Sequence, residues 1–306
     1  MFDIIIPVFK TPMHLLKQCL ESVAKQTFTD YKIWVCDGTP HEWKRYDEML
    51  EVFNSYENLE YVRQTGKGVS QARNQIIEMG SNPYVAFLDS DDSWEPFYLE
   101  KMMEAIERPL NPCTGFWFCE IQEFTTKHSL LDLKTIGSDL KAGLVVEGSM
   151  ILQNYEIVNY IPPKYHLTFH HKSPVWFTGA IISRDALNET DLFKEDITIG
   201  EDTLLMLEVL SKGYSSCFVP IVGAKRNTHN EQLTKNLNDR DWDDADNYES
   251  LYTERVYSVL DDDIHPLHKE MLLLYLDNGK NRGITKRNCP TNVYLISEED
   301  YEIETL

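Results

Sequence analysis

The sequence lacks any run of apolar residues long enough to cross a membrane. Its apolar runs, such as Ile4 to Ile6 and Met271 to Leu274, fall far short of the roughly 20 residues that a spanning helix needs. The chain also leads straight into Asp3 and a strand-like run, without the basic start and long apolar stretch of a signal peptide. We therefore expect no integral membrane association and a cytoplasmic location.

Basic residues are scarce as well. The chain has 29 Lys and Arg against 50 Asp and Glu, for a net charge of −21. Such a balance excludes a broad positive surface for nucleic acid or for anionic lipid. A local basic group remains possible within it, and the tightest one comprises Lys280, Arg282, Lys286 and Arg287.

Proline and glycine are few, at 13 and 14, and no low-complexity tract interrupts the 306 residues. With 42% hydrophobic residues, the chain can bury a substantial core and form one large domain or two small ones.

CxxC pairs are absent too. We expect free, mostly buried thiols in a reducing compartment rather than disulfides. The six cysteines are Cys19, Cys36, Cys113, Cys119, Cys217 and Cys289.

Strand-like and helix-like segments alternate through the first third of the chain. This rhythm predicts an α/β fold with a doubly wound, mostly parallel sheet of the Rossmann-like type. Ligands bind such sheets beyond the carboxyl ends of the strands. Thr11 and Pro12 are typical of the N-cap and first residue of a helix. The expected strands are 3–9, 32–36, 59–62 and 84–88, and the expected helices follow Pro12, cover 43–53 and 69–79, and begin at Pro96.

The later pattern is less regular. Residues 123–174 have a weak pattern and are interpreted as an insertion of mixed structure, and residues 236–306 as an acidic, helical C-terminal extension. Between these segments we expect strands at 115–119, 176–182 and 214–219, and a helix at 200–212.

Three carboxylates stand directly after the buried strand 84–88, in the run Asp89-Ser90-Asp91-Asp92. They repel one another unless a cation or solvent compensates them. A hard divalent ion with oxygen ligands suits them, and Mg²⁺ or Mn²⁺ also favours phosphate oxygens. The alternative is an acidic turn that stabilises the next helix through its dipole, and the same alternative applies to Glu201 and Asp202.

Several short motifs follow one another along the chain in a fixed order. In order and spacing, residues 1–235 resemble the family-2 glycosyltransferases, which have a GT-A fold. The motifs are Ile4–Phe9, Leu20–Phe28, Val35–Thr39, Gly68–Asn74, Ala86–Asp92, Phe177–Gly179, Ile182–Leu187, Gly200–Asp202, Gly213–Tyr214 and Arg226–His229.

The resemblance implies a GT-A-type sheet and a division of labour along the chain. Residues 1–110 would form the half that binds a nucleotide-sugar, and 111–235 the half that binds the acceptor and carries the catalytic base. The reaction implied is transfer of a sugar from a nucleotide-sugar, a UDP-sugar, to a hydroxyl by a metal-dependent inverting displacement.

Site residues carry over from the family position by position. Pro7, Val8, Phe9 and Asp37 match the wall around nucleobase and ribose, although Cys36 stands where the family usually has a further acid. The resemblance assigns Gly68, Arg73 and Ser90 to the donor as well, with Arg73 either a diphosphate or a structural contact. Asp89 and Asp91 match the DxD pair that holds ribose and the Mn²⁺ or Mg²⁺ ion, and His229 a late phosphate or metal contact. Asp202, next to Glu201, matches the catalytic base, and Trp176 and Gly179 the acceptor side.

This reaction agrees with the chemistry of the residues. Loss of a nucleoside diphosphate builds negative charge, which a divalent ion on Asp91 offsets. A carboxylate such as Asp202 on the opposite side can take the proton of the acceptor hydroxyl, which gives inversion. The acceptor could be a glycan, a lipid-linked sugar, a protein or, less readily, a modified nucleic-acid base.

Two other functions compete with this interpretation. A sugar-phosphate nucleotidyltransferase would carry a glycine-rich loop after the first strand, where this chain has Pro7 to Pro12 without glycine. An inactive nucleotide- or sugar-binding module would not need the carboxylates Asp89, Asp91, Glu201 and Asp202 together.

Overall fold

The computed structural model describes residues 1–108, 113–124, 150–151, 158–161, 177–197, 201–212 and 214–227. Trp176, His229, Cys289 and the expected extension 236–306 lie outside these residues, as does most of the expected insertion 123–174. Within the described part of the chain, no helix combines the length and the apolarity needed to cross a membrane.

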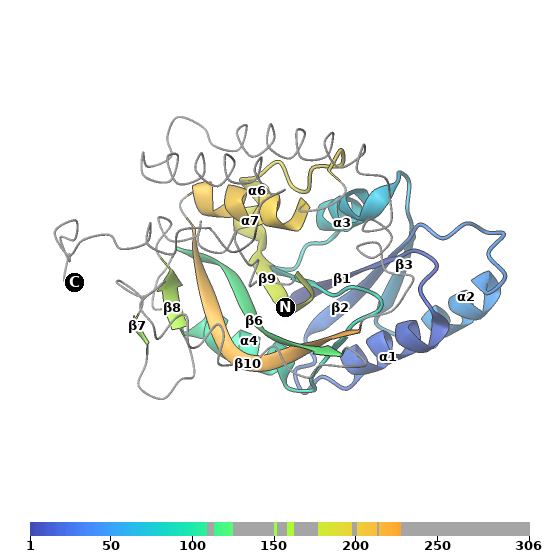
Figure 1. The fold of residues 1–306 in the computed structure, drawn as a ribbon, viewed down its shortest axis with the longest axis horizontal. Coiled ribbons are helices and arrows are strands. Elements are labelled where there is room, and N and C mark those ends of the chain that lie inside the picture. The colour runs from blue at the N-terminus through green and yellow to red at the C-terminus, as the bar shows by residue number, and fades with distance from the viewer. Residues whose placement is uncertain are drawn as a thin grey trace, which may run out of the picture.

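One mixed sheet organises the described residues (Figure 1). Its strand order is β3-β2-β1-β4-β9-β6-β10-β8-β7, and β5 pairs with β10 off this path. The strands are β1 (Phe2–Val8), β2 (Tyr31–Asp37), β3 (Leu59–Arg63), β4 (Tyr84–Phe87), β5 (Ser93–Trp94), β6 (Thr114–Phe124), β7 (Met150–Ile151), β8 (Val158–Ile161), β9 (Ala180–Ser183) and β10 (Ser215–Asn227).

The long pairings are parallel, as the strand–helix rhythm predicts. β1 is parallel to β2 and β4, β2 to β3, and β6 to β10. β9 is the exception at the centre, because it runs antiparallel to both of its neighbours, β4 and β6. The predicted GT-A-type, mostly parallel α/β architecture is confirmed, with β9 joining a first parallel group of strands to a second.

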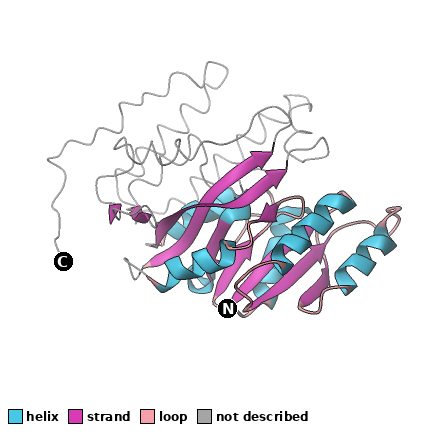
Figure 2. Cartoon of the chain, turned by 90° about the horizontal axis from the view of Figure 1, so that it is seen from below, coloured by secondary structure: helices cyan, strands magenta, loops and turns pink. Residues whose placement is uncertain are grey.

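Helices cover both faces of the sheet (Figures 1 and 2). In Figure 1, α3, α6 and α7 lie above the sheet and α1, α2 and α4 lie below it. The helices are α1 (Met13–Ala24), α2 (Tyr46–Asn54), α3 (Gly68–Met79), α4 (Tyr98–Glu107), α6 (Arg184–Asn188) and α7 (Glu201–Ser211).

The unbroken apolar run in β1 follows from this two-sided cover. Ile4 and Ile6 pack in the core with α1, α2 and α4, whereas Ile5 packs in the core with α3, α6 and α7. Successive side chains of a strand point to opposite faces, so a strand buried on both faces must be apolar throughout. Cys19, Cys36, Cys119 and Cys217 are buried and form no disulfide in the described part of the chain, as expected, and Cys113 is exposed.

Three local predictions differ from the structure. Thr11 does not cap α1, because the cap position is Pro12 and the Thr11 hydroxyl instead meets Ser90 Oγ at 2.7 Å. The apolar run predicted as a strand over 176–182 begins with a 3-10 turn, Phe177–Gly179, and becomes a strand only at Ala180. β10 continues to Asn227 through register shifts after Val219, so Pro220 does not end the strand.

A buried ion pair ties the start of the sheet to α6. Asp3 is buried in β1, and its carboxylate accepts from Arg184 Nη2 at 2.7 Å and from Trp34 Nε1 at 2.8 Å. The backbone N–H of Asn82 donates to the same carboxylate at 2.9 Å. A buried charge with this many donors stabilises the fold only while both partners of the pair are present.

Asp3→Ala is expected to lower the free energy of unfolding by about 3–5 kcal/mol, because it leaves Arg184 without its buried counter-charge. Equilibrium unfolding in urea measures the change. The control is Glu60→Ala, which removes an exposed ion pair with Lys32 and should stay within about 0.5 kcal/mol of the unaltered chain. Equal losses in the two variants would contradict this account of the Asp3 cluster.

Candidate functional site

The predicted site residues gather at the carboxyl ends of β1, β2 and β4. Because these strands are parallel neighbours, the segments that follow them emerge at one edge of the sheet. Asp89 to Asp92 follow β4, Phe9 follows β1, and Asp37 is the last residue of β2.

The acid loop, residues 89–92, is held by contacts from two other segments of the chain. Thr11 Oγ1 lies 2.7 Å from Ser90 Oγ. Asn227, at the end of β10, donates through its side-chain amide to the Asp91 carbonyl at 2.7 Å and through its backbone N–H to the Asp92 carboxylate at 2.9 Å. The segment before α1 and the end of β10 therefore fix the loop. Asn227 lies in the motif Arg226–His229, but no role at the candidate site was predicted for it from the sequence.

Negative charge in the acid loop is only partly compensated by the chain. Burial raises the pKa of the Asp92 carboxyl well above its usual range, and the charges of Asp91 and Asp89 raise it further. The Asn227 N–H and Arg226 act in the opposite direction. Protonation of one acid or binding of a cation would relieve this repulsion.

Arg73 bridges the acid loop and the start of α7. From α3, its Nη2 donates to Asp89 Oδ1 and its Nη1 to Glu201 Oε1, each at 2.9 Å. The Arg73 side chain is only 5% exposed, and the rings of Phe177 and Phe193 lie 5.6 and 5.1 Å from its guanidinium carbon. The bridge joins the acid loop to the second predicted pair of acids.

Glu201 and Asp202 have different surroundings although they are neighbours in the first turn of α7. Glu201 is buried, and burial, followed by the charge of Asp202, raises its pKa to about 7 even though Arg73 pulls it down. Asp202 is only partly buried. Glu201 is thus buried in the interior, whereas Asp202 lies nearer to the surface.

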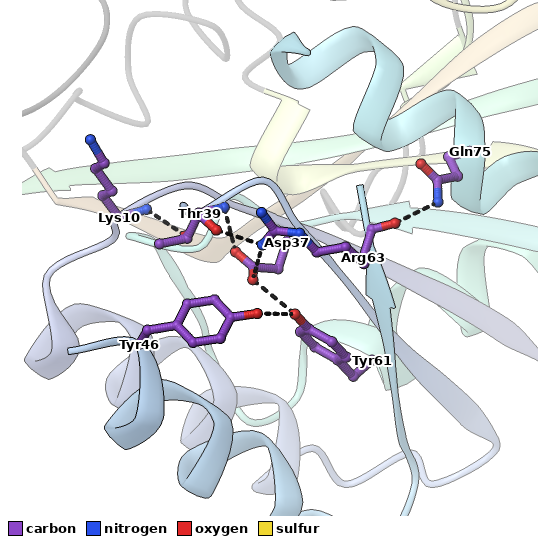
Figure 3. Close-up of polar contacts among 7 residues, drawn as sticks. All are labelled: Lys10, Asp37, Thr39, Tyr46, Tyr61, Arg63 and Gln75. Atoms are coloured by element: carbon purple, nitrogen blue, oxygen red, sulfur yellow. Dashed lines mark hydrogen bonds and ion pairs between the residues drawn. The ribbon is translucent and has the colours of Figure 1, made fainter. Parts of the chain in front are cut away.

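Asp37 lies at the centre of a polar cluster at the ends of β2 and β3 (Figure 3). It is fully buried, and its Oδ1 accepts from the Thr39 N–H at 2.7 Å. Its Oδ2 accepts from Tyr61 OH at 3.0 Å and from Arg63 Nη1 at 2.9 Å. Tyr46 OH lies 3.0 Å from Tyr61 OH and extends the cluster to α2. The Asp37 carboxylate therefore fixes its neighbours, and any ligand at this edge meets a prearranged polar surface.

Tyr61 and Arg63 were not found by sequence reasoning. The pattern that could have identified them is the alternation of side chains between the two faces of β3, which puts positions 61 and 63 on the same face. Cys36, by the same alternation in β2, lies in the core on the other face from Asp37. Burial and the charge of Asp37 raise the pKa of its thiol to about 12, so the thiol remains neutral.

The other predicted donor-binding residues differ in how far a ligand could reach them. Phe9 is 63% exposed, and a Cβ on Gly38 would lie 3.5 Å from its ring. Val8 is buried in the core, so only its backbone can face a ligand. Gly68 opens α3 with φ +84°, and a Cβ there would meet nothing within 4 Å.

On the predicted acceptor side, only Gly179 belongs to the described residues. It is buried, and a Cβ at this position would lie 3.0 Å from Cys119 Sγ and 3.2 Å from Ile121 Cδ1. Its neighbour Thr178 holds Trp94, whose Nε1 donates to the Thr178 carbonyl at 2.6 Å. Gly179 thus allows the 3-10 turn to pack closely on β6.

Two carboxylates of the acid loop, Asp89 and Asp91, could hold a divalent ion together with a ligand's phosphates. No group of three or more His, Cys, Asp or Glu side chains in the described ranges is arranged to hold a metal by itself. The Asp89 side chain is, however, 44% exposed and gives only Oδ1 to Arg73, and Asp91 is partly exposed. Mg²⁺ is commonly held by one or two carboxylates together with substrate phosphates, and this oxygen donor set fits that arrangement.

Comparison with known sequences points to one family. A sequence model described as "Glycosyl transferase family 2" matches residues 3–190. The chain is 30% identical over 215 residues to the uncharacterized glycosyltransferase YibD of Escherichia coli K12, which covers 63% of this chain and 60% of that protein. It is 34% identical over 92 residues to the Escherichia coli enzyme named UDP-Glc:alpha-D-GlcNAc-diphosphoundecaprenol beta-1,3-glucosyltransferase WfgD, which covers 30% of this chain and 35% of that one. The chain thus spans less than two thirds of the length of these relatives.

Solved structures show the same fold. TarS of S. aureus, residues 1–349 in complex with UDP-GlcNAc, superposes with a TM-score of 0.64 at 16% identity. The superposition covers 94% of this chain and 74% of that one. The complex of the same TarS fragment with UDP gives a TM-score of 0.62. At this identity the likeness establishes the architecture alone.

The raised pKa of Glu201 predicts a pH-dependent stability. An unfolded Glu has a pKa near 4.3, and that of folded Glu201 is about 7. The folded chain therefore holds an extra proton between these values, and its free energy of unfolding falls as the pH rises through this window. From pH 5 to 8, the unaltered chain should lose on the order of 1–3 kcal/mol more than Glu201→Gln, which cannot titrate.

Urea unfolding at pH 5, 6, 7 and 8 measures this difference. Glu104→Gln, a change in an exposed pair with Lys101, serves as the control and should keep the slope of the unaltered chain. Parallel curves for the unaltered chain and Glu201→Gln would show that burial does not disfavour the Glu201 carboxylate.

Proposed function

The chain belongs to glycosyl transferase family 2, and on that premise we propose that it transfers a sugar from a nucleotide-sugar to an acceptor hydroxyl by a metal-dependent, inverting displacement. One observation carries the proposal: the acid loop at the end of β4 and the acids that open α7 are joined by a single buried Arg73. This arrangement supports the proposal that one carboxylate site takes the cation and phosphates and the other takes the proton.

We propose a UDP-sugar as the donor. The printed name of WfgD specifies UDP-Glc, and TarS has been solved with UDP and with UDP-GlcNAc. In this chain, the exposed ring of Phe9 offers a stacking surface beside Gly38. The fixed polar cluster around Asp37 lies at the same sheet edge, where Arg63, which bonds Asp37 through Nη1, can present its other N–H groups to a base.

Asp91 and Asp89 Oδ2, the oxygen that does not bond Arg73, would hold the Mn²⁺ or Mg²⁺ ion. When bound, the ion supplies positive charge next to the leaving diphosphate oxygens. The chain fixes this site in advance, because Asn227 holds the Asp91 carbonyl and Thr11 holds Ser90. Little reorganisation is then needed when charge develops.

Asp202 serves as the base in this mechanism. The acceptor oxygen forms a bond to the anomeric carbon while the bond from that carbon to the phosphate oxygen breaks. The acceptor proton passes to Asp202, and the nucleoside diphosphate leaves with the electron pair. Attack and departure occur on opposite sides of the carbon, so the configuration inverts.

The acceptor is a hydroxyl of a glycan, a lipid-linked sugar or a protein. A modified nucleic-acid base suits the net charge of −21 least. The buried cysteines of the described residues, such as Cys19 and Cys36, form no disulfide. They support a reducing compartment, so we place the reaction in the cytoplasm.

Asp91→Asn is expected to abolish the dependence of donor binding on Mn²⁺ while the fold stays intact, since the neutral amide is a poor ligand for a hard cation. Calorimetric titration of UDP with and without Mn²⁺ measures the effect, and circular dichroism checks the fold. Glu57→Gln, far from the acid loop in sequence and outside the site, is the control. Full turnover in EDTA would contradict metal dependence.

UDP should stabilise the chain more than GDP, ADP or CMP in the presence of Mn²⁺, since a ligand that binds only the folded state raises the unfolding temperature by mass action. Thermal-shift measurements at equal nucleotide concentration test this order. Equal or greater stabilisation by GDP would contradict the uridine assignment. The replacement of the family's usual acid by Cys36, next to Asp37, would then be the expected cause.

Asp202→Asn is expected to keep near-normal UDP affinity and to lose on the order of 10²-fold or more in turnover, because only proton transfer needs the carboxylate. UDP release from a panel of UDP-sugars, with water as acceptor, measures turnover. Glu201→Gln, the adjacent matched variant, should lose less. An active Asp202→Asn beside an inactive Glu201→Gln would exchange the two roles.

A further inference from the structure

We propose that Arg73 is a positioning residue that links the metal-side carboxylate of Asp89 to the helix carrying the base Asp202, with Glu201 as its anchor on that helix. The inference deepens the proposed function and rests on it for the roles of Asp89 and Asp202. It assigns Glu201 to the bridge instead of to proton transfer.

The geometry of Arg73 is that of a two-sided clamp. Its two terminal nitrogens donate to carboxylates from different elements, Nη2 to Asp89 in the acid loop and Nη1 to Glu201 at the start of α7, both at 2.9 Å. Phe177 and Phe193 lie within 5.6 Å of the guanidinium carbon. A planar guanidinium can hold two carboxylates in fixed directions, whereas a lysine ammonium is a point charge on a flexible stem.

The same contacts argue against Arg73 as a direct ligand of the donor diphosphate. Its side chain is 5% exposed, and both terminal nitrogens are already paired. Its Nε is buried and has no hydrogen-bond partner within the described part of the chain. Each terminal nitrogen retains a second N–H, but a phosphate could reach it only by displacing the side chains that bury Arg73.

Glu201 has the properties of an anchor. Its side chain is 10% exposed and its Oε1 accepts from Arg73, whereas Asp202 is less buried and follows directly on the same helical turn. The charges of Asp89, Glu201 and Asp202 all act on Arg73. One positive charge is thus shared among donor-side and base-side carboxylates in a poorly solvated place, where such contacts influence one another strongly.

The first test needs no ligand. In Arg73→Lys, one nitrogen must serve two carboxylates, so the amides in the first turns of α7 should exchange hydrogen about tenfold faster than in the unaltered chain. Arg184→Lys is the matched control, since Arg184 also pairs with a buried carboxylate, Asp3, but away from this site. Unchanged exchange in α7 of Arg73→Lys, or an equal change in Arg184→Lys, overturns the bridge.

The second test separates positioning from donor binding. Arg73→Lys should lower kcat for UDP-sugar hydrolysis on the order of tenfold and leave the donor KM within about threefold. Adding Glu201→Gln to Arg73→Lys should cause no further loss, because both changes break one unit. A large rise in KM with kcat unchanged would make Arg73 a donor ligand, and losses that multiply would give Glu201 a separate role; either result overturns the proposal.

The two tests also distinguish this inference from the proposed function. If the unaltered chain neither binds UDP with Mn²⁺ nor hydrolyses any UDP-sugar, the proposed function fails, and hydrogen exchange alone decides whether the bridge exists. Should Arg73→Lys fail to fold, Glu201→Gln gives the exchange test from the other end of the bridge. Loosening of the same turn is then expected, and an unchanged turn overturns the inference.

Discussion

Mutual repulsion among carboxylates at the end of β4 is the constraint to which the rest of the site responds. Asp89, Asp91 and Asp92 lie in one short loop, and burial, followed by the charges of Asp91 and Asp89, raises the pKa of Asp92. The chain compensates with Arg73 on one side and with Asn227 and Arg226 on the other. These compensating groups come from α3 and β10, so the loop gathers distant parts of the sheet around it.

Much of the fold could be predicted from local patterns. The apolar run of β1 indicated a strand buried on both faces, and the ordered motifs indicated the architecture and the family before any contact was known. The pairs Asp89/Asp91 and Glu201/Asp202 could be predicted as candidate site residues because each follows a recognisable strand or begins a recognisable helix. Their connection through Arg73 is a long-range contact, which no local pattern contains.

Other features could not be predicted, for physical reasons. Thr is a residue type favoured at helix N-caps, but the hydroxyl of Thr11 contacts Ser90 in the acid loop instead. That tertiary contact overrides the local preference. An apolar run such as 176–182 suits a buried turn as well as a strand, and only the packing of Gly179 against β6 separates the two. Tyr61 and Arg63 become site residues solely because β3 lies beside β2.

The antiparallel strand β9 sets an order of events during synthesis. β4 and β6 do not pair with each other; the space between them is filled by Ala180–Ser183, which the ribosome makes long after both. Until that segment emerges, one border of β4 is unpaired and β6 lacks both of its neighbours, β9 and β10. These borders carry Val, Phe and Trp, and they favour association with other chains. We therefore expect chaperones to bind a nascent chain that stalls before residue 180, even if its first three strands have already formed.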